Sequence, residues 1–86
     1  MSATKKYYSH PFRERLSRLM FSAFTVQGLT YGEMTQEAGI RRSTMNSYRE
    51  GVCLPGAENL LKLADYFGVS TDYLLGREGY ELEEKK

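Results

Sequence analysis

The amino-acid sequence predicts an all-α fold of five short helices, and three observations lead to that prediction. Apolar residues recur at intervals of three and four, the spacing that places side chains on one face of a helix. Apolar and polar residues alternate nowhere over a useful length, so no strand is predicted. A glycine follows each helical segment, where a left-handed residue can end a helix: Gly28, Gly39, Gly51, Gly68 and Gly76.

The first helix is expected over residues 11–27. Pro11 suits the first helical position, because its missing amide hydrogen would have no partner there. The core-facing stripe is expected to contain Phe12, Leu16, Leu19, Ala23 and Val26, with Met20 at its edge. Phe21 and Phe24 fall outside this stripe, which predicts an exposed aromatic pair. The pair is interpreted either as a surface for a second copy or partner, or as cover for the tyrosine-rich segment before Pro11.

The stretch from Thr30 to Gly51 is interpreted as two short helices joined by a tight turn. Thr30 followed by Glu33 fits a capping box, in which each side chain accepts a hydrogen bond from a backbone amide of the first turn. Gly39 can take a left-handed conformation and end this helix, and Ile40 is the apolar residue that packs just after it.

The second helix of this pair is expected from about Arg42 to Arg49, with Met45 and Tyr48 facing inward. The side chains left on the outside are Arg42, Ser43, Asn46, Ser47 and Arg49. Arginine can grip guanine and asparagine can grip adenine through two hydrogen bonds, and serine adapts to either base. A polar outer face also suits any solvated helix, so these residues alone leave DNA binding and an ordinary surface equally open.

The remaining helices are expected at residues 57–67 and 71–75. The first has a core stripe of Leu60, Leu63, Ala64 and Phe67. Ser70 caps the second, and Asp72 lies in its first turn, where a carboxylate favours the helix dipole. Cys53, in the extended connection before residue 57, has no cysteine or histidine near it and is expected to be a small packing residue.

Length and charge predict one small domain over residues 11–76, between a flexible basic N-terminal arm (1–10) and a charged C-terminal tail (77–86). The net charge is only +1, but its distribution is uneven. Residues 1–55 hold eight Lys and Arg against four Glu, and residues 56–86 hold four basic against seven acidic residues. Such a domain can present a basic face to a polyanion and an acidic face elsewhere.

Several classes of protein are disfavoured. A single cysteine allows no intrachain disulfide and suggests a reducing cytoplasm. No apolar run approaches the roughly 20 residues that span a membrane. The only histidine, His10, has no evident Cys or Ser partner, so we expect neither an enzyme nor a metal site or cofactor. Neither a separate effector domain nor a small-molecule ligand is expected.

Two stretches together resemble the lambda-repressor/Cro-like helix-turn-helix family (the XRE family). They are GLTYGEMTQEAGIRRSTMNSYREG and, after it, P-x-x-x-x-L-x-x-L-A-x-x-F-G-V-S-x-D-Y-L-L-G, so that the likeness covers roughly residues 12–76. The resemblance implies a compact five-helix lambda-repressor-like DNA-binding domain, with the helix-turn-helix in helices two and three. It also implies that helix three enters the major groove of double-stranded DNA and that the protein acts as a dimer on a two-fold operator.

Carried over residue by residue, the resemblance assigns DNA contacts to Arg41, Arg42, Ser43, Thr44, Asn46, Ser47, Arg49 and Tyr31. The chain departs from the family's usual pattern in several places, including Thr35, where Ala is usual, and Arg49-Glu50-Gly51, where Glu-Asn-Gly is usual and which makes the recognition helix more basic. Tyr31 stands where Gln is common, so a phosphate contact there would have to use the phenol hydroxyl. Gly32 is a poor helix residue, costing about 1 kcal/mol against Ala, unless the backbone must approach DNA closely. The apolar loop 52–54 replaces frequent Lys and Arg.

Two hypotheses follow. The first is a sequence-specific DNA-binding transcriptional regulator, a repressor of phage, mobile-element or antitoxin type. It would act as a homodimer through Phe21 and Phe24 or through the C-terminal helix and tail. The second is a protein-protein interaction module on the same scaffold, supported by Phe21, Phe24, the apolar loop and the near-zero net charge.

Overall fold

The computed structural model describes residues 11–77, and its five helices over that range lie where the sequence predicted them. They are α1 (Pro11–Gln27), α2 (Tyr31–Ala38), α3 (Arg42–Glu50), α4 (Ala57–Phe67) and α5 (Thr71–Leu75). Residues 11–77 contain no strand, which agrees with the all-α prediction. The expected arm, residues 1–10, and residues 78–86 of the expected tail lie outside the described residues. None of the five helices is long and apolar enough to cross a membrane.

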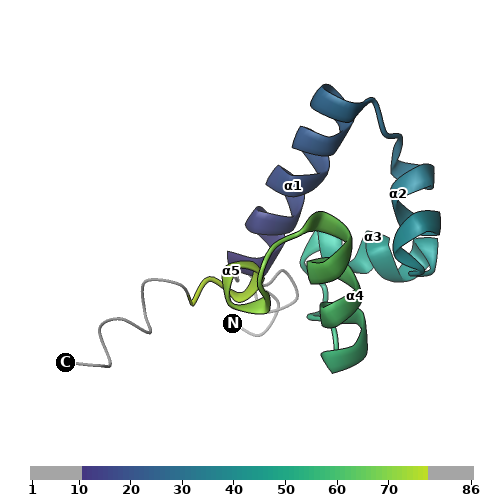
Figure 1. The fold of residues 1–86 in the computed structure, drawn as a ribbon. Helices are drawn as coiled ribbons and strands as arrows, with labels where there is room; N and C mark the ends of the chain where they lie inside the picture. Colours follow the sequence, from purple (N-terminus) through teal and green to yellow (C-terminus); the bar gives the residue numbers. More distant parts are fainter. Residues whose placement is uncertain (1–10, 78–86) are drawn as a thin grey trace.

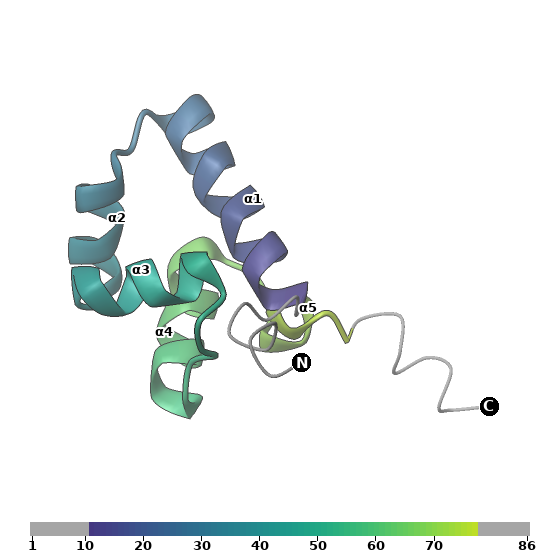
Figure 2. The same cartoon turned by 180° about the vertical axis from the view of Figure 1, so that it is seen from behind.

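The helices surround a single core (Figure 1). Helix α1 is the longest, and α5 lies against its first turn in both views. Figure 2 shows α3 on the face opposite to that of Figure 1, where it runs from the end of α2 towards α1 and crosses in front of α4. Helix α3 therefore packs against α1 and α2 and lies over α4, and no helix crosses in front of it in Figure 2.

Each helix contributes at least one side chain to the centre of the core. The six large side chains that are fully buried are Phe12 and Leu16 from α1, Met34 from α2, Met45 from α3, Leu63 from α4 and Leu74 from α5. Two sequence expectations were wrong. Val26 is 78% exposed, because the last turn of α1 projects past the helices packed against it, and Met20 is buried instead. Cys53 is exposed, because its connection runs over the surface.

The ends of the helices are bonded as the sequence indicated. The capping box of α2 is present: the Glu33 amide donates to Thr30 Oγ1 at 3.2 Å, and the Thr30 amide donates to Glu33 Oε1 at 2.9 Å. Ser70 Oγ accepts from the Tyr73 amide at 3.0 Å at the start of α5. Gly39 ends α2 with a φ of 76°, and the buried Ile40 follows it.

Three basic side chains tie helices together by donating to backbone carbonyls at the C-terminal ends of other helices. Cations are favourable there, because the last carbonyls of a helix lack helical partners and carry partial negative charge. The bonds are Arg13 Nε to the Arg49 carbonyl at 3.1 Å, Arg15 Nη1 to the Tyr73 carbonyl at 2.9 Å and Lys62 Nζ to the Gly39 carbonyl at 3.2 Å. These three cations therefore already have structural roles.

We expect Gly76→Ala to destabilise the domain by about 2–4 kcal/mol. Gly76 has a φ of +75°, and an added Cβ would lie 2.7 Å from Cβ of Pro11, so α5 would have to move away from α1. The strained φ contributes about 1 kcal/mol and the overpacking about 1–3 kcal/mol. Gly68→Ala is the matched control, because Gly68 has a similar φ of +70° with open space around its Cβ position. Equal losses in urea unfolding for the two variants would show that the contact with Pro11 has no effect.

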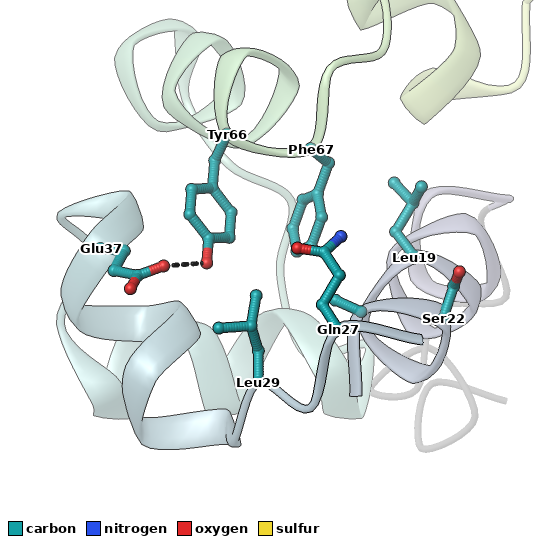
Figure 3. A pocket seen from close by; sticks show the side chains of 8 residues that line it. Leu19, Ser22, Gln27, Leu29, Glu37, Tyr66 and Phe67 are labelled. Carbon is teal, nitrogen blue, oxygen red and sulfur yellow. Dashed lines mark hydrogen bonds between the residues drawn. The ribbon is translucent and has the colours of Figure 1, made fainter. Parts of the chain in front are cut away.

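A cavity of about 290 Å³ lies between α1, α2 and α4 (Figure 3). Its lining combines Leu19, Leu29 and Phe67 with polar groups, and within residues 11–77 Glu37 is the only charged residue of this lining. The Tyr66 hydroxyl donates to Glu37 Oε1 across the cavity, which connects α4 to α2. The two most polar groups of this cavity thus satisfy one another.

The pKa of the Tyr66 hydroxyl is expected to lie well above that of an ordinary tyrosine. Burial, followed by the hydrogen bond to Glu37 and the nearby charges of Glu37 and Glu33, raises the pKa of Tyr66 from 10.0 to about 12. Because the pKa is raised in the folded state, the neutral Tyr66 hydroxyl stabilises the folded chain fully below about pH 10. That stabilisation is lost as the pH rises through about 12. Ultraviolet absorbance follows the ionisation of tyrosine to tyrosinate as the pH rises. The ionisation step at the highest pH should belong to Tyr66, so Tyr66→Phe should remove that step. In Glu37→Gln the step should move towards 10.0, and an unmoved step would contradict the assignment to Glu37.

Candidate nucleic-acid interface

Helix α3 is anchored on its inner side and uncovered on its outer side. Met45 is 0% exposed and Tyr48 is 3% exposed. The Tyr48 ring meets Phe12 edge to face at 5.9 Å, and its hydroxyl accepts from Asn59 Nδ2 at 2.9 Å. The buried phenol oxygen therefore has a partner, which such a group requires. With these contacts holding α3 to α1 and α4, its polar side chains are presented outward from a fixed support.

Tyr31, the first residue of α2, lies against three polar side chains of α3. Its ring centroid is 5.1 Å from Cζ of Arg42 and 4.7 Å from Cζ of Arg49, and its hydroxyl donates to Asn46 Oδ1 at 2.5 Å. Arg42, Asn46 and Arg49 stand at i, i+4 and i+7, which places them in one stripe along the helix. We call these four residues the Tyr31 cluster.

The outer side of this helix pair carries arginine side chains that make no ion pair with the described part of the chain. Within residues 11–77, Arg41, Arg42 and Arg49 form no ion pair, whereas the exposed Arg18 pairs with Glu14 at 3.5 Å. Guanidinium groups within about 6 Å of an aromatic ring are attracted to its face. The Tyr31 ring thus holds two like charges near each other, an arrangement that an incoming anion would stabilise.

The other predicted DNA-binding residues lie around the cluster without contacting it through a described hydrogen bond. Arg41 is the exposed N-cap residue of α3 and makes no side-chain cap, so that the first amides of α3 have no side-chain acceptor there. Ser43 is exposed, and its carbonyl accepts from the half-buried Ser47 hydroxyl at 3.3 Å. Thr44 is half-buried.

Sequence reasoning missed one neighbour of this surface, Arg13, and noted another, Gly32, only in connection with a close approach to DNA. Arg13 of α1 bonds the Arg49 carbonyl, a contact between residues 36 apart that no local pattern indicated. Gly32 lies beside Arg42, whose Nη1 would be 3.5 Å from an added Cβ. This is an ordinary van der Waals distance to the end of a flexible side chain, so no neighbour among the described residues requires a glycine here.

A family model described as "Helix-turn-helix" matches residues 27–74, from the last residue of α1 into α5. This match covers more than half of the chain. The chain belongs to the XRE family of helix-turn-helix proteins. The fold agrees with that membership: α2, the turn after Gly39, and α3 form the helix-turn-helix, and the Tyr31 cluster joins its two helices.

Two relatives of this helix-turn-helix chain have names that describe transcriptional regulators. It is 42% identical over 48 residues to the cryptic phage CTXphi transcriptional repressor RstR of Vibrio cholerae serotype O1. It is 35% identical over 51 residues to the HTH-type transcriptional regulator ImmR of Bacillus subtilis. The matched segments cover 56% and 59% of this chain, but only 43% and 40% of the two relatives.

Proposed function

We propose that this helix-turn-helix chain is a sequence-specific DNA-binding transcriptional repressor of phage or mobile-element type. The observation that carries the proposal is the Tyr31 cluster, which places two guanidinium groups and an amide on the outer side of α3. The names of the two relatives, one a phage repressor, support the same function. The proposal includes a cytoplasmic location and binding without cofactor, small-molecule ligand or catalytic step.

In this proposal α3 lies in the major groove, and α2 braces it across the DNA backbone. Arginine side chains such as Arg41 neutralise phosphates and release counterions, which makes the affinity sensitive to salt. Base edges are read by exposed side chains of α3, each good bidentate pair contributing about 1–3 kcal/mol of discrimination: Arg42, Ser43, Asn46, Ser47 and Arg49. One helix reads only a few base pairs, so we propose a homodimer on two half-sites, which represses by covering a promoter.

Within this mechanism Tyr31 positions the side chains that touch DNA. Its hydroxyl engages one lone pair of Asn46 Oδ1, which fixes the amide and leaves both Nδ2 hydrogens free to donate to a base. Its ring limits the rotamers of Arg42 and Arg49 before DNA arrives, so less side-chain entropy is lost on binding.

Tyr31→Phe is expected to weaken specific binding by about 2–10-fold, the equivalent of one ordinary hydrogen bond. The loss should concentrate at the base pair read by Asn46, because the phenylalanine ring still supports both arginines. Competition binding against single-base variants of the site measures this. A uniform loss across all variants would indicate that the Tyr31 hydroxyl contacts a phosphate instead of orienting Asn46.

A selection from random DNA tests the proposed function. The purified chain is incubated with a pool of random duplexes, and the bound fraction is recovered and sequenced at two salt concentrations. An enriched inverted repeat, with half-site centres about one helical turn apart, is the expected result and would identify the operator. Recovery without sequence preference that disappears at moderate salt would leave only a basic surface and contradict specific repression.

A further inference from the structure

Phe21 and Phe24 form an aromatic pair on the outer side of α1, as the sequence predicted. Their side chains are 68% and 56% exposed. They stand three residues apart, on the same side of α1 as Ser17 and Met20, which line the same groove. Large apolar side chains that cluster on the surface commonly mark a binding surface, because the exposure of apolar area to water is unfavourable.

The aromatic pair borders a groove of about 460 Å³ between α1, α2 and α3, which we call the aromatic groove. Its described lining consists of Ser17, Met20, Phe21 and Phe24 from α1, Tyr31 and Met34 from α2 with its N-cap residue Thr30, and Arg49 from α3. Met20 and Met34 are 6% and 2% exposed, so the part of the groove they form is anchored in the core. The volume falls in the range of natural ligand-binding clefts.

The charge that the described residues bring to the aromatic groove is positive. Among residues 11–77, Arg49 is the only charged residue that lines it, and Arg13 lies beside Arg49, donating to its carbonyl at 3.1 Å. No carboxylate from the part of the chain that the structure describes lines the groove. Arginine pairs strongly with carboxylates through parallel hydrogen bonds, and aromatic residues and arginine dominate the energetic centres of protein interfaces. The matching occupant therefore combines apolar side chains with a carboxylate.

We infer that the aromatic groove docks an acidic amphipathic helix of a partner protein. Apolar side chains spaced at i and i+3 or i+4 would contact Phe21 and Phe24, and a neighbouring Asp or Glu would bind Arg49. A second copy of this chain fits less well. A two-fold contact presents the same surface to itself, and the described residues of this lining include no carboxylate for the other copy's Arg49.

Docking at this groove also regulates the proposed function. Tyr31 and Arg49 line the aromatic groove and belong to the Tyr31 cluster, so a helix bound to Arg49 competes with DNA. The partner would then release the repressor from its operator. This regulatory step rests on the proposed DNA binding, whereas the docking of the acidic helix does not.

The probe is a phage-displayed library of random twelve-residue peptides selected on the purified chain, with counter-selection on the double variant Phe21→Ser, Phe24→Ser. Enriched peptides should carry apolar residues at helical spacing together with Asp or Glu. Labelled copies should bind the double variant and Arg49→Gln at least about tenfold more weakly than the parent chain. Leu61→Ser is the matched control, because it removes a 55% exposed apolar side chain from α4, and it should bind normally.

Selected operator DNA should displace the labelled peptide, and the double variant should still bind that DNA. The docking proposal is overturned if no consensus emerges, if the consensus lacks acidic residues, or if the double variant binds the peptides normally. Conversion of a dimer to a monomer by the double variant would assign the groove to a second copy. If the chain bound peptide and DNA at the same time, only the proposed competition between them would be overturned, and the docking proposal would stand. Failure of the parent chain to select DNA would refute the proposed function and leave the peptide result to stand separately.

Discussion

Replacing Arg42 by Ala is expected to reduce affinity for the selected operator by about 10–100-fold. Arg42 lies at the first position of α3, its guanidinium contacts the Tyr31 ring, and it has no ion-pair partner within residues 11–77. Its removal deletes a cation that is already oriented, and a specific contact of this type contributes about 1–3 kcal/mol. The free energy of unfolding should change little, because Arg42 is exposed.

The salt dependence of binding separates two roles for Arg42. If it binds a phosphate, the Ala variant should lose affinity for all sequences and its slope of log affinity against log salt should fall by about one. If it reads a base, the loss should appear at one position of the site. Arg18→Ala is the control, because Arg18 is a similarly exposed arginine on α1 that pairs with Glu14. Unchanged operator affinity of Arg42→Ala at two salt concentrations would remove Arg42 from the interface.

Leu16→Ala is expected to destabilise the domain by about 3–5 kcal/mol. Leu16 is 0% exposed in the middle of α1, where it belongs to the core that all five helices share. The loss combines the transfer of the missing methyl groups with the cavity that remains. Small domains have total stabilities towards the lower end of about 5–15 kcal/mol, so this one change could leave the chain partly unfolded at room temperature.

Thermal and urea unfolding of Leu16→Ala measure that loss. Leu61→Ala serves as the comparison, because it removes the same groups from a side chain that is 55% exposed, and it should shift stability by no more than about 0.5 kcal/mol. Similar losses for the two variants would mean that burial does not determine their contribution. DNA binding by Leu16→Ala should fall only in proportion to its unfolded fraction, because Leu16 has no part in the Tyr31 cluster.

The sequence by itself determined the five helices and their ends, because the signals for them are local. The pairing of Thr30 with Glu33, the glycine after each helix and the spacing of apolar residues all operate within about one or two turns. Even so, the same periodicity misplaced Val26, because a helical stripe shows which side can be buried but not where the neighbouring helices stop.

The residue types of the candidate interface could also be predicted from the sequence, but their arrangement could not. Tyr31 meets Asn46 across 15 positions and Arg13 meets the Arg49 carbonyl across 36, and such contacts depend on how the helices are placed relative to one another. Only the tertiary structure decided that Arg13 and Arg15 bond carbonyls while Arg42 and Arg49 remain available on one ring. The physical reason is that helix packing is fixed by the shared core, and surface side chains meet wherever that packing brings them.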